Sequence, residues 1–265
     1  MLSFQQYIIE RETNIMVDDL DLEFLRKAER VTSFNISTKD FESLKHKKEI
    51  QHLINKHFFP KFDISKTING VNKNTLNKLI DELKAEDSTM FSKLHSYALK
   101  GVGPGEAALF FLINDAHLGG GSSAGVDLVV GSNKYEVKAV QTTQDNEGLI
   151  AYDFKLGGTV RLTDIMQDLA KLADFYKVSG SKTEINKSSI QKLKNGEISG
   201  IDFSAIEDRY RKRAYEYFKN HEVIFINNSK TKKQGRVEAI KKIRQQDIMI
   251  ERVTSGTIKP MVYID

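Results

Sequence analysis

Apolar residues in the first hundred positions recur every three or four residues, which is the spacing of one face of a helix. The clearest stripes run through Leu76, Leu79, Ile80 and Leu83, and through Phe91, Leu94, Tyr97 and Ala98. Strand-like alternation is scarce there, while Pro60 and Asn69-Gly70 predict loops around residues 58–72. We therefore expect an α-helical N-terminal region over residues 1–98, with residues 1–95 as a candidate surface for a protein partner.

After Gly101 the pattern changes to a mixture of helix and strand. Pro104 suits the first turn of a helix, which the apolar residues 107–113 continue. Two runs rich in strand-forming residues, 126–130 and 134–140, flank the turn residues Gly131-Ser132-Asn133, which predicts a hairpin. Further along, residues 149–156 fit a third strand and an apolar stripe over 162–176 fits a helix.

A helix is also predicted from the capping-box spacing of Ser204 and Glu207 to about Phe218. Tyr210, Tyr217 and Phe218 lie at helical spacing, which favours core packing over a platform for stacked bases. The remaining segments predict three more elements: a buried strand at 222–226, a short helix at 237–244, and a hairpin over 247–264 that turns at Ser255-Gly256.

These elements together predict an α/β fold with a mixed sheet flanked by helices. Its core is expected over residues 99–265, with a helical basic insertion around 181–220. The chain is 40% hydrophobic and 29% charged, as in ordinary globular proteins. It has no apolar run near the roughly 20 residues that cross a bilayer, and no basic segment followed by an apolar one at its start. We expect a protein that avoids the membrane and acts in the cytoplasm of a bacterial or phage-infected cell.

Residue types limit the chemistry that is available. With no cysteine, the chain cannot form disulfides, thiolate nucleophiles or cysteine zinc sites, and its six histidines include no HExxH pair. Hard cations such as Mg²⁺, which prefer carboxylates and water, stay open. The net charge of +4 is uneven, because residues 205–245 hold twelve Lys or Arg against five Asp or Glu. A local basic excess suits a polyanion such as DNA, although a solvated helix face has the same pattern.

The candidate chemistry lies on the predicted hairpin. Glu136 and Lys138 are two residues apart on one strand and therefore point to the same face. The turn at 131–133 brings Asp127, at the start of the paired strand, near Glu136. Two close carboxylates repel, so a divalent cation between them is expected, with the Val137 carbonyl and water completing its oxygen shell. Lys138 would then orient the attacking water or stabilise charge on a phosphate.

Asp127, Glu136 and Lys138 resemble the motif of the PD-(D/E)XK nuclease superfamily. Glu106 matches the glutamate on the preceding helix that many members carry. The resemblance implies a restriction endonuclease-like fold, in the order helix, three-stranded meander, helix and strand, around Mg²⁺ or Mn²⁺. It also implies that Glu106, Asp127, Glu136 and Lys138 are catalytic. It covers residues 100 to 178 and, through a later strand, 221 to 227.

Other positions fit this resemblance less closely. Ser122 and Ser123 are similar to a loop of archaeal Holliday junction resolvases, and Gln141 to a glutamine of exonuclease-like branches. Val126 stands where the superfamily name has Pro. The short stretch between the Glu106 helix and Asp127 leaves room for a very short first strand, unless residues 149–156 complete the sheet in a different order.

The residues and the resemblance together predict a metal-dependent deoxyribonuclease that hydrolyses phosphodiester bonds. We also expect it to cut as an endonuclease and to form a homodimer. Ser122, Ser123, Gln141, Arg209, Arg211 and Lys212 are its candidate DNA contacts. The bare motif alone favours an exposed strand with a solvated Glu and Lys, and the surrounding pattern of turn, strands, helices and basic segment favours the nuclease. The alternative is therefore a non-catalytic DNA-binding or structural protein, for example a phage component, that retains a nuclease-like fold.

Overall fold

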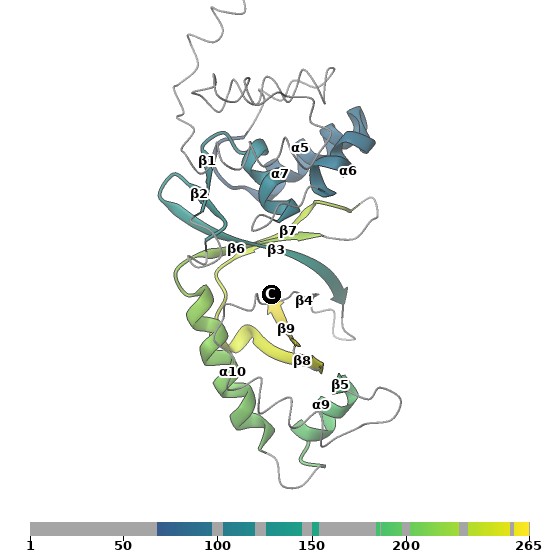
Figure 1. Ribbon diagram of the computed structural model, residues 1–265, viewed down its shortest axis with the longest axis vertical. Helices are drawn as coiled ribbons and strands as arrows, with labels where there is room; N and C mark the ends of the chain where they lie inside the picture. The colour runs from purple at the N-terminus through teal and green to yellow at the C-terminus, as the bar shows by residue number, and fades with distance from the viewer. Residues whose placement is uncertain are drawn as a thin grey trace, which may run out of the picture.

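A computed structural model of the chain describes residues 68–96, 103–119, 126–144, 150–153, 184–185, 187–197, 202–227, 233–254 and 257–264. Within these ranges the strands form one continuous sheet of nine strands, and helices pack on it (Figure 1). The protein is therefore an α/β fold, as predicted. The sheet has two parts, which share the long strand β3 (Asn133–Gln144).

The first part is a five-stranded mixed sheet. Strands β1 (Ala116–Leu118), β2 (Leu128–Val130) and β3 form an antiparallel meander. Strand β6 (Glu222–Asn227) then pairs parallel to β3, and β7 (Val237–Lys241) pairs antiparallel to β6. The predicted hairpin at 126–140 and the strand at 222–226 are confirmed. Gly131 permits the tight turn of the hairpin because its φ is +58°, a conformation that L side chains rarely adopt.

The second part of the sheet is antiparallel and starts at the C-terminal half of β3. Residues 141–144 pair with β4 (Ile150–Asp153), which in turn pairs with β9 (Thr257–Ile264). Strand β8 (Ile248–Thr254) follows in the sheet, with the two-residue β5 (Glu184–Ile185) beside it. The predicted third strand and closing hairpin are thus confirmed, and a 3-10 turn, η1 (Gln245–Asp247), precedes the hairpin.

Three helices cover one face of the mixed sheet: α5 (Lys73–Glu86), α6 (Ser88–Ser96) and α7 (Pro104–Leu112). Helix α7 begins at Pro104, as predicted, and its apolar residues are buried against the sheet. Side chains from α5, α6, α7 and strands β1, β2, β3, β6 and β7 form one hydrophobic cluster. Helices on both sides of residue 98, where the sequence suggested a division, therefore contribute to one core.

The other face of β6 packs on a second hydrophobic cluster, formed mainly by α9 (Lys187–Lys194), α10 (Phe203–Phe218) and β8. Alternation along β6 explains how one strand serves both clusters. Ile224 and Ile226 belong to the first cluster, while Val223 and Phe225 belong to the second. A strand that is buried on both faces is typical of parallel pairing in α/β folds. In Figure 1, α10 and α5 accordingly lie on opposite sides of β6.

Two local predictions are wrong. Residues 237–241 form strand β7, not the start of a helix, because pairing with β6 buries Val237 in the first cluster and, across a shift in register, Ala239 in the second. Helix α10 begins after Asp202, whose Oδ1 atom accepts a hydrogen bond from Ala205 N at 3.0 Å, instead of at the predicted Ser204 cap. The stretch before Asp127 does hold a very short strand, the three-residue β1. The predicted helix at 162–176 lies outside the described residues.

Candidate active site

Asp127 is held directly against the middle of β3. Its backbone N–H donates to Tyr135 O at 2.9 Å, and its Oδ2 atom accepts from Val137 N at 2.7 Å. These two hydrogen bonds lie on either side of Glu136 in the sequence. The carboxyl group of Asp127 is therefore anchored beside Glu136 by the hairpin itself.

Glu136 is buried, with 1% of its surface exposed. Its parallel register with Val223 places it on the α10 face of the sheet, and Lys138, opposite Phe225, lies on the same face. The Oε1 atom of Glu136 accepts hydrogen bonds from Lys138 Nζ and from the hydroxyl group of Tyr217 on α10. The Oε2 atom is buried without a hydrogen-bond partner. A buried carboxylate oxygen without a partner is costly, and a cation at Oε2 would remove this cost.

Glu106, in the first turn of α7, adds a third carboxyl group to this region. Burial, reinforced by the negative charge of Asp127, raises the pKa of Glu106 to about 8. Burial and the charge of Glu136 likewise raise the pKa of Asp127 to about 6. The positive charge of Lys138 opposes both shifts but does not cancel them. Without a cation the region therefore favours the protonated forms of these carboxyl groups, and a divalent cation would favour their ionised forms.

The donor set fits Mg²⁺ or Mn²⁺ only in part. Asp127 and Glu136 offer carboxylate oxygens, which these ions prefer. Across the described ranges, however, no group of three or more His, Cys, Asp or Glu side chains is arranged to hold a metal ion. Two carboxylates with water and a backbone carbonyl match the sparse protein coordination that is usual for Mg²⁺.

The other sequence-predicted residues lie at different places. Val137 donates its N–H to Asp127, and its side chain belongs to the cluster under α7. Gln141 pairs through its backbone with Asp153 of β4. Ser122 and Ser123 lie outside the described residues.

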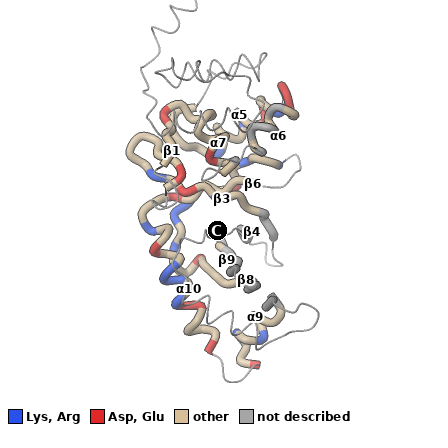
Figure 2. Tube along the Cα trace, in the orientation of Figure 1, with Lys and Arg blue, Asp and Glu red and all other residues tan. Residues whose placement is uncertain are grey.

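The three candidate DNA contacts on α10 differ from one another. Figure 2 shows basic residues along this helix, and Arg209 and Lys212 are exposed. Arg211 instead binds within the protein: its Nε atom donates to Ile248 O at 2.8 Å, and it forms an ion pair with the buried Glu207 at 3.2 Å. Arg211 therefore attaches α10 to β8, which leaves Arg209 and Lys212 as the better placed candidates for DNA.

Two residues of the site were missed or misjudged from the sequence. Tyr217 was expected in the core, yet it is only half-buried and its hydroxyl group reaches Glu136. Burial and the charge of Glu136 raise the pKa of Tyr217, so its hydroxyl group stays protonated and donates. His221 lies 6.0 Å from the Tyr217 ring, with a buried Nε2 atom that has no hydrogen-bond partner. The sequence did hold a signal for these residues. Tyr217 precedes the buried Phe218 at the edge of the apolar stripe, and strand β6 begins directly after this helix.

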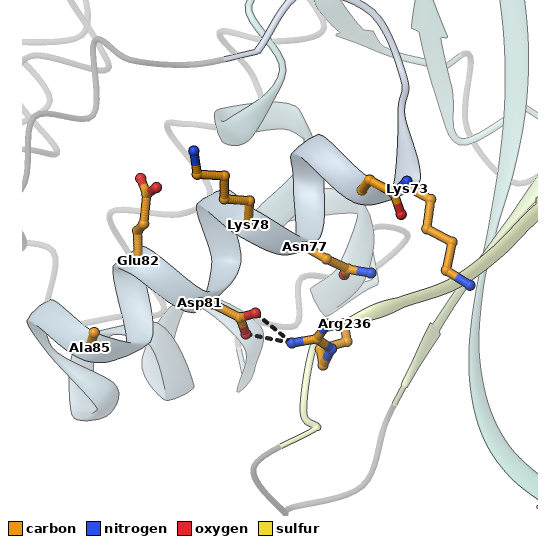
Figure 3. A pocket seen from close by; sticks show the side chains of 8 residues that line it. Lys73, Asn77, Lys78, Asp81, Glu82, Ala85 and Arg236 are labelled. Atoms are coloured by element: carbon orange, nitrogen blue, oxygen red, sulfur yellow. Dashed lines mark hydrogen bonds and ion pairs between the residues drawn. The ribbon is translucent and has the colours of Figure 1, made fainter.

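A separate pocket of about 660 Å³ runs along α5. It is lined by Lys73, Asn74, Asn77, Lys78, Asp81, Glu82, Ala85 and Arg236 (Figure 3). Arg236 donates to both carboxylate oxygens of Asp81 at 2.6 Å. The carboxylate cluster around Glu136 has no residue in this lining, so the two features are distinct.

Comparisons of the sequence with models of protein families and with curated proteins, and of the fold with solved structures, find no significant match. None of the described helices is long and apolar enough to span a membrane. A functional interpretation therefore depends on the residues themselves and on their geometry.

Proposed function

We propose that this protein is a Mg²⁺- or Mn²⁺-dependent nuclease that hydrolyses phosphodiester bonds in DNA, with internal cutting as the expected mode. The observation that carries the proposal is the buried, unpartnered Oε2 atom of Glu136 beside the anchored carboxyl group of Asp127. Phosphodiester hydrolysis also needs a positive charge near the phosphate and contacts to the DNA backbone, for which Lys138 and the exposed basic residues of α10 are available.

The order of elements also supports the proposal. Helix α7, the meander β1–β2–β3 and the parallel strand β6 occur in the order of the PD-(D/E)XK core, with Asp127 and Glu136 at its hairpin. A helix, α10, directly precedes β6 in the chain, as the helix before the last strand does in that core. Within the α/β class, we propose that the fold is restriction endonuclease-like.

In this proposal the residues have separate roles. Asp127 and Glu136 would hold the cation, together with the Val137 carbonyl and water. The bound cation supplies polarisation of a phosphoryl oxygen and a more acidic water. Lys138 exchanges its contact with Glu136 for the charge on the phosphate, and the carboxyl group of Glu106 orients a water molecule. Arg209 and Lys212 contact the backbone of the DNA.

The proposal predicts that the purified protein cuts DNA with Mg²⁺ or Mn²⁺ and that EDTA stops the cutting. Asp127→Asn, Glu136→Gln and Lys138→Ala should each lower the cutting rate by roughly 100-fold or more, because each removes a charge that acts on the reacting phosphate. The measurement is the initial rate of cleavage of a circular plasmid and of a linear duplex, which also separates internal from terminal cutting.

Matched variants control for folding and general charge. Lys134→Ala removes an exposed lysine from the same strand as Lys138, and Asp208→Asn and Glu216→Gln remove exposed carboxylates from α10. These three should cut at rates close to that of the parent chain. Undiminished cutting by all three site variants, or no cutting by the parent chain with any divalent ion, would overturn the proposal.

Two observations favour a second candidate function, a DNA-binding or structural protein without turnover. Lys138 already provides a positive charge at Oε1 of Glu136, and the described residues hold no three-ligand metal cluster. A protein of this kind would form a salt-sensitive complex with DNA that stays intact with Mg²⁺ and Mn²⁺. Gel analysis of the DNA recovered from the complex distinguishes the two candidates.

A further inference from the structure

Tyr217 is the point at which α10 contacts the candidate active site. Its hydroxyl group donates to Oε1 of Glu136, the same oxygen that accepts from Lys138. Its ring lies edge-on to Phe218 with centroids 5.0 Å apart and edge-on to His221 at 6.0 Å. The ammonium group of Lys138 lies 5.6 Å from the ring centroid. Contacts on several sides therefore hold the phenol in one orientation.

This orientation determines how the carboxylate plane of Glu136 is held. The terminal torsion of a glutamate is broad, so the plane of an unrestrained carboxylate can rotate. A fixed donor at Oε1 restrains this rotation and so fixes the direction of Oε2, the oxygen without a partner. Lys138 is a less permanent hydrogen-bond donor to Glu136 than Tyr217, because the proposed reaction needs its flexible side chain at the phosphate.

We propose that Tyr217 is a positioning residue of the metal site: its hydroxyl group holds Oε1 of Glu136 so that Oε2 is presented to the divalent cation. The inference rests on the proposed function, because the cation is the one that the nuclease would use. Tyr217 itself contacts neither the cation nor the DNA. Groups that orient metal ligands in this way typically contribute 10- to 100-fold to metal affinity or activity.

The test compares Tyr217→Phe with Tyr215→Phe in the full-length chain. Tyr217→Phe removes only the hydroxyl group and keeps the ring against Phe218 and His221. Tyr215→Phe makes the same chemical change two residues earlier on α10, at a half-buried position packed against the second hydrophobic cluster. Circular dichroism and the thermal midpoint verify that both variants are folded.

Calorimetric titration with Mn²⁺ should give a Kd about tenfold higher for Tyr217→Phe than for the parent chain, and an unchanged Kd for Tyr215→Phe. In cleavage assays at a low metal concentration, Tyr217→Phe should lower kcat while the KM for DNA stays the same. Raising the Mg²⁺ concentration should restore kcat. A purely structural role for Tyr217 would not produce this rescue by the metal.

A Kd of Tyr217→Phe within twofold of the parent value, or a loss of kcat that excess Mg²⁺ does not restore, would overturn the inference. If the parent chain binds Mn²⁺ but does not cut DNA, the proposed nuclease is wrong while the calorimetric comparison still decides the role of Tyr217. If the parent chain binds no divalent ion, both proposals are wrong.

Discussion

Among the residues that the structure describes, the carboxyl groups of Glu106, Asp127 and Glu136 lie near one ammonium group, that of Lys138, in a buried region. The raised pKa of Glu106, about 8 against an ordinary value of 4.5, has a direct consequence for stability. Between these pH values the folded chain binds more protons than the unfolded chain. The free energy of unfolding of the metal-free protein should therefore fall as the pH rises through this window.

Glu106→Gln should remove much of this pH dependence, because glutamine does not ionise. We expect the variant to be more stable than the parent chain by about 1–3 kcal/mol at pH 8.5 and to differ less at pH 5, in the absence of metal. Urea unfolding at several pH values in EDTA measures the difference. Glu82→Gln, on the exposed side of α5, is the control and should follow the parent curve.

A divalent cation, like the substitution Glu106→Gln, should make the protein more stable at high pH. Mg²⁺ bound among the carboxylates favours their ionised forms, so it should raise the stability of the parent chain most at high pH. Parallel pH profiles for the parent chain and Glu106→Gln in EDTA would show that Glu106 is not the group responsible.

The attachment of α5 to the edge strand β7 shows how a helix and a strand are joined by one side chain. Asn77 donates from Nδ2 to Val237 O at 2.9 Å and accepts at Oδ1 from Val237 N at 2.8 Å. It thereby occupies the place of a neighbouring strand at this residue. Both partners are buried, so these backbone groups depend on Asn77 for their hydrogen bonds.

Asn77→Ala should lower the free energy of unfolding by about 2–4 kcal/mol, because it leaves a buried N–H and a buried C=O unpaired. Lys78→Ala, at the next and exposed position of α5, should change it by no more than about 0.5 kcal/mol. Chemical denaturation monitored by circular dichroism measures both values. A loss of under about 0.5 kcal/mol for Asn77→Ala would mean that water replaces the amide without penalty.

Across the whole molecule, the two hydrophobic clusters on opposite faces of β6 separate two surfaces. On one surface, the pocket along α5 mixes basic and acidic side chains, and Asp81 and Arg236 form an ion pair there. On the other surface, α10 exposes Arg209, Lys212 and Arg213, while Tyr217 near the end of the helix contacts Glu136. A polyanion along α10 would therefore lie on the same side of the sheet as the side chains of Glu136 and Lys138.

This arrangement predicts that α10 accounts for part of the salt dependence of DNA binding. Replacing Arg209, Lys212 and Arg213 together by Ala should make the slope of log K against log salt shallower by about 0.9 for each lost phosphate contact. Fluorescence anisotropy in EDTA, which prevents cutting, measures the slope. Lys73→Ala with Lys78→Ala, on α5, should leave it unchanged; an unchanged slope for the α10 variant would exclude this face as the binding surface.

Local patterns were sufficient for much of this fold. The β2–β3 hairpin, α7 and the β8–β9 hairpin follow from alternation, turn residues and a helix-opening proline, which are properties of neighbouring residues. Residues 237–241 were misassigned because their strand depends on pairing with β6, a partner that periodicity within the segment does not reveal. The start of α10 was misplaced because Asp202 and Ser204 are both good helix caps by residue type.

The candidate site, like the fold, has one part that local sequence predicts and another that depends on contacts between distant segments. The proximity of Asp127 to Glu136, and the common face of Glu136 and Lys138, follow from the residue sequence because a short turn and strand alternation leave the chain few other arrangements. The contact of Tyr217 with Glu136 joins positions 81 residues apart, and the internal binding of Arg211 to Ile248 joins positions 37 apart. Such contacts arise only when packing of α10 against the sheet brings distant segments together. The folded molecule therefore decides how the carboxylate of Glu136 is oriented, which arginines face the solvent, and how the carboxyl pKa values shift, since each depends on burial and on neighbours from other elements.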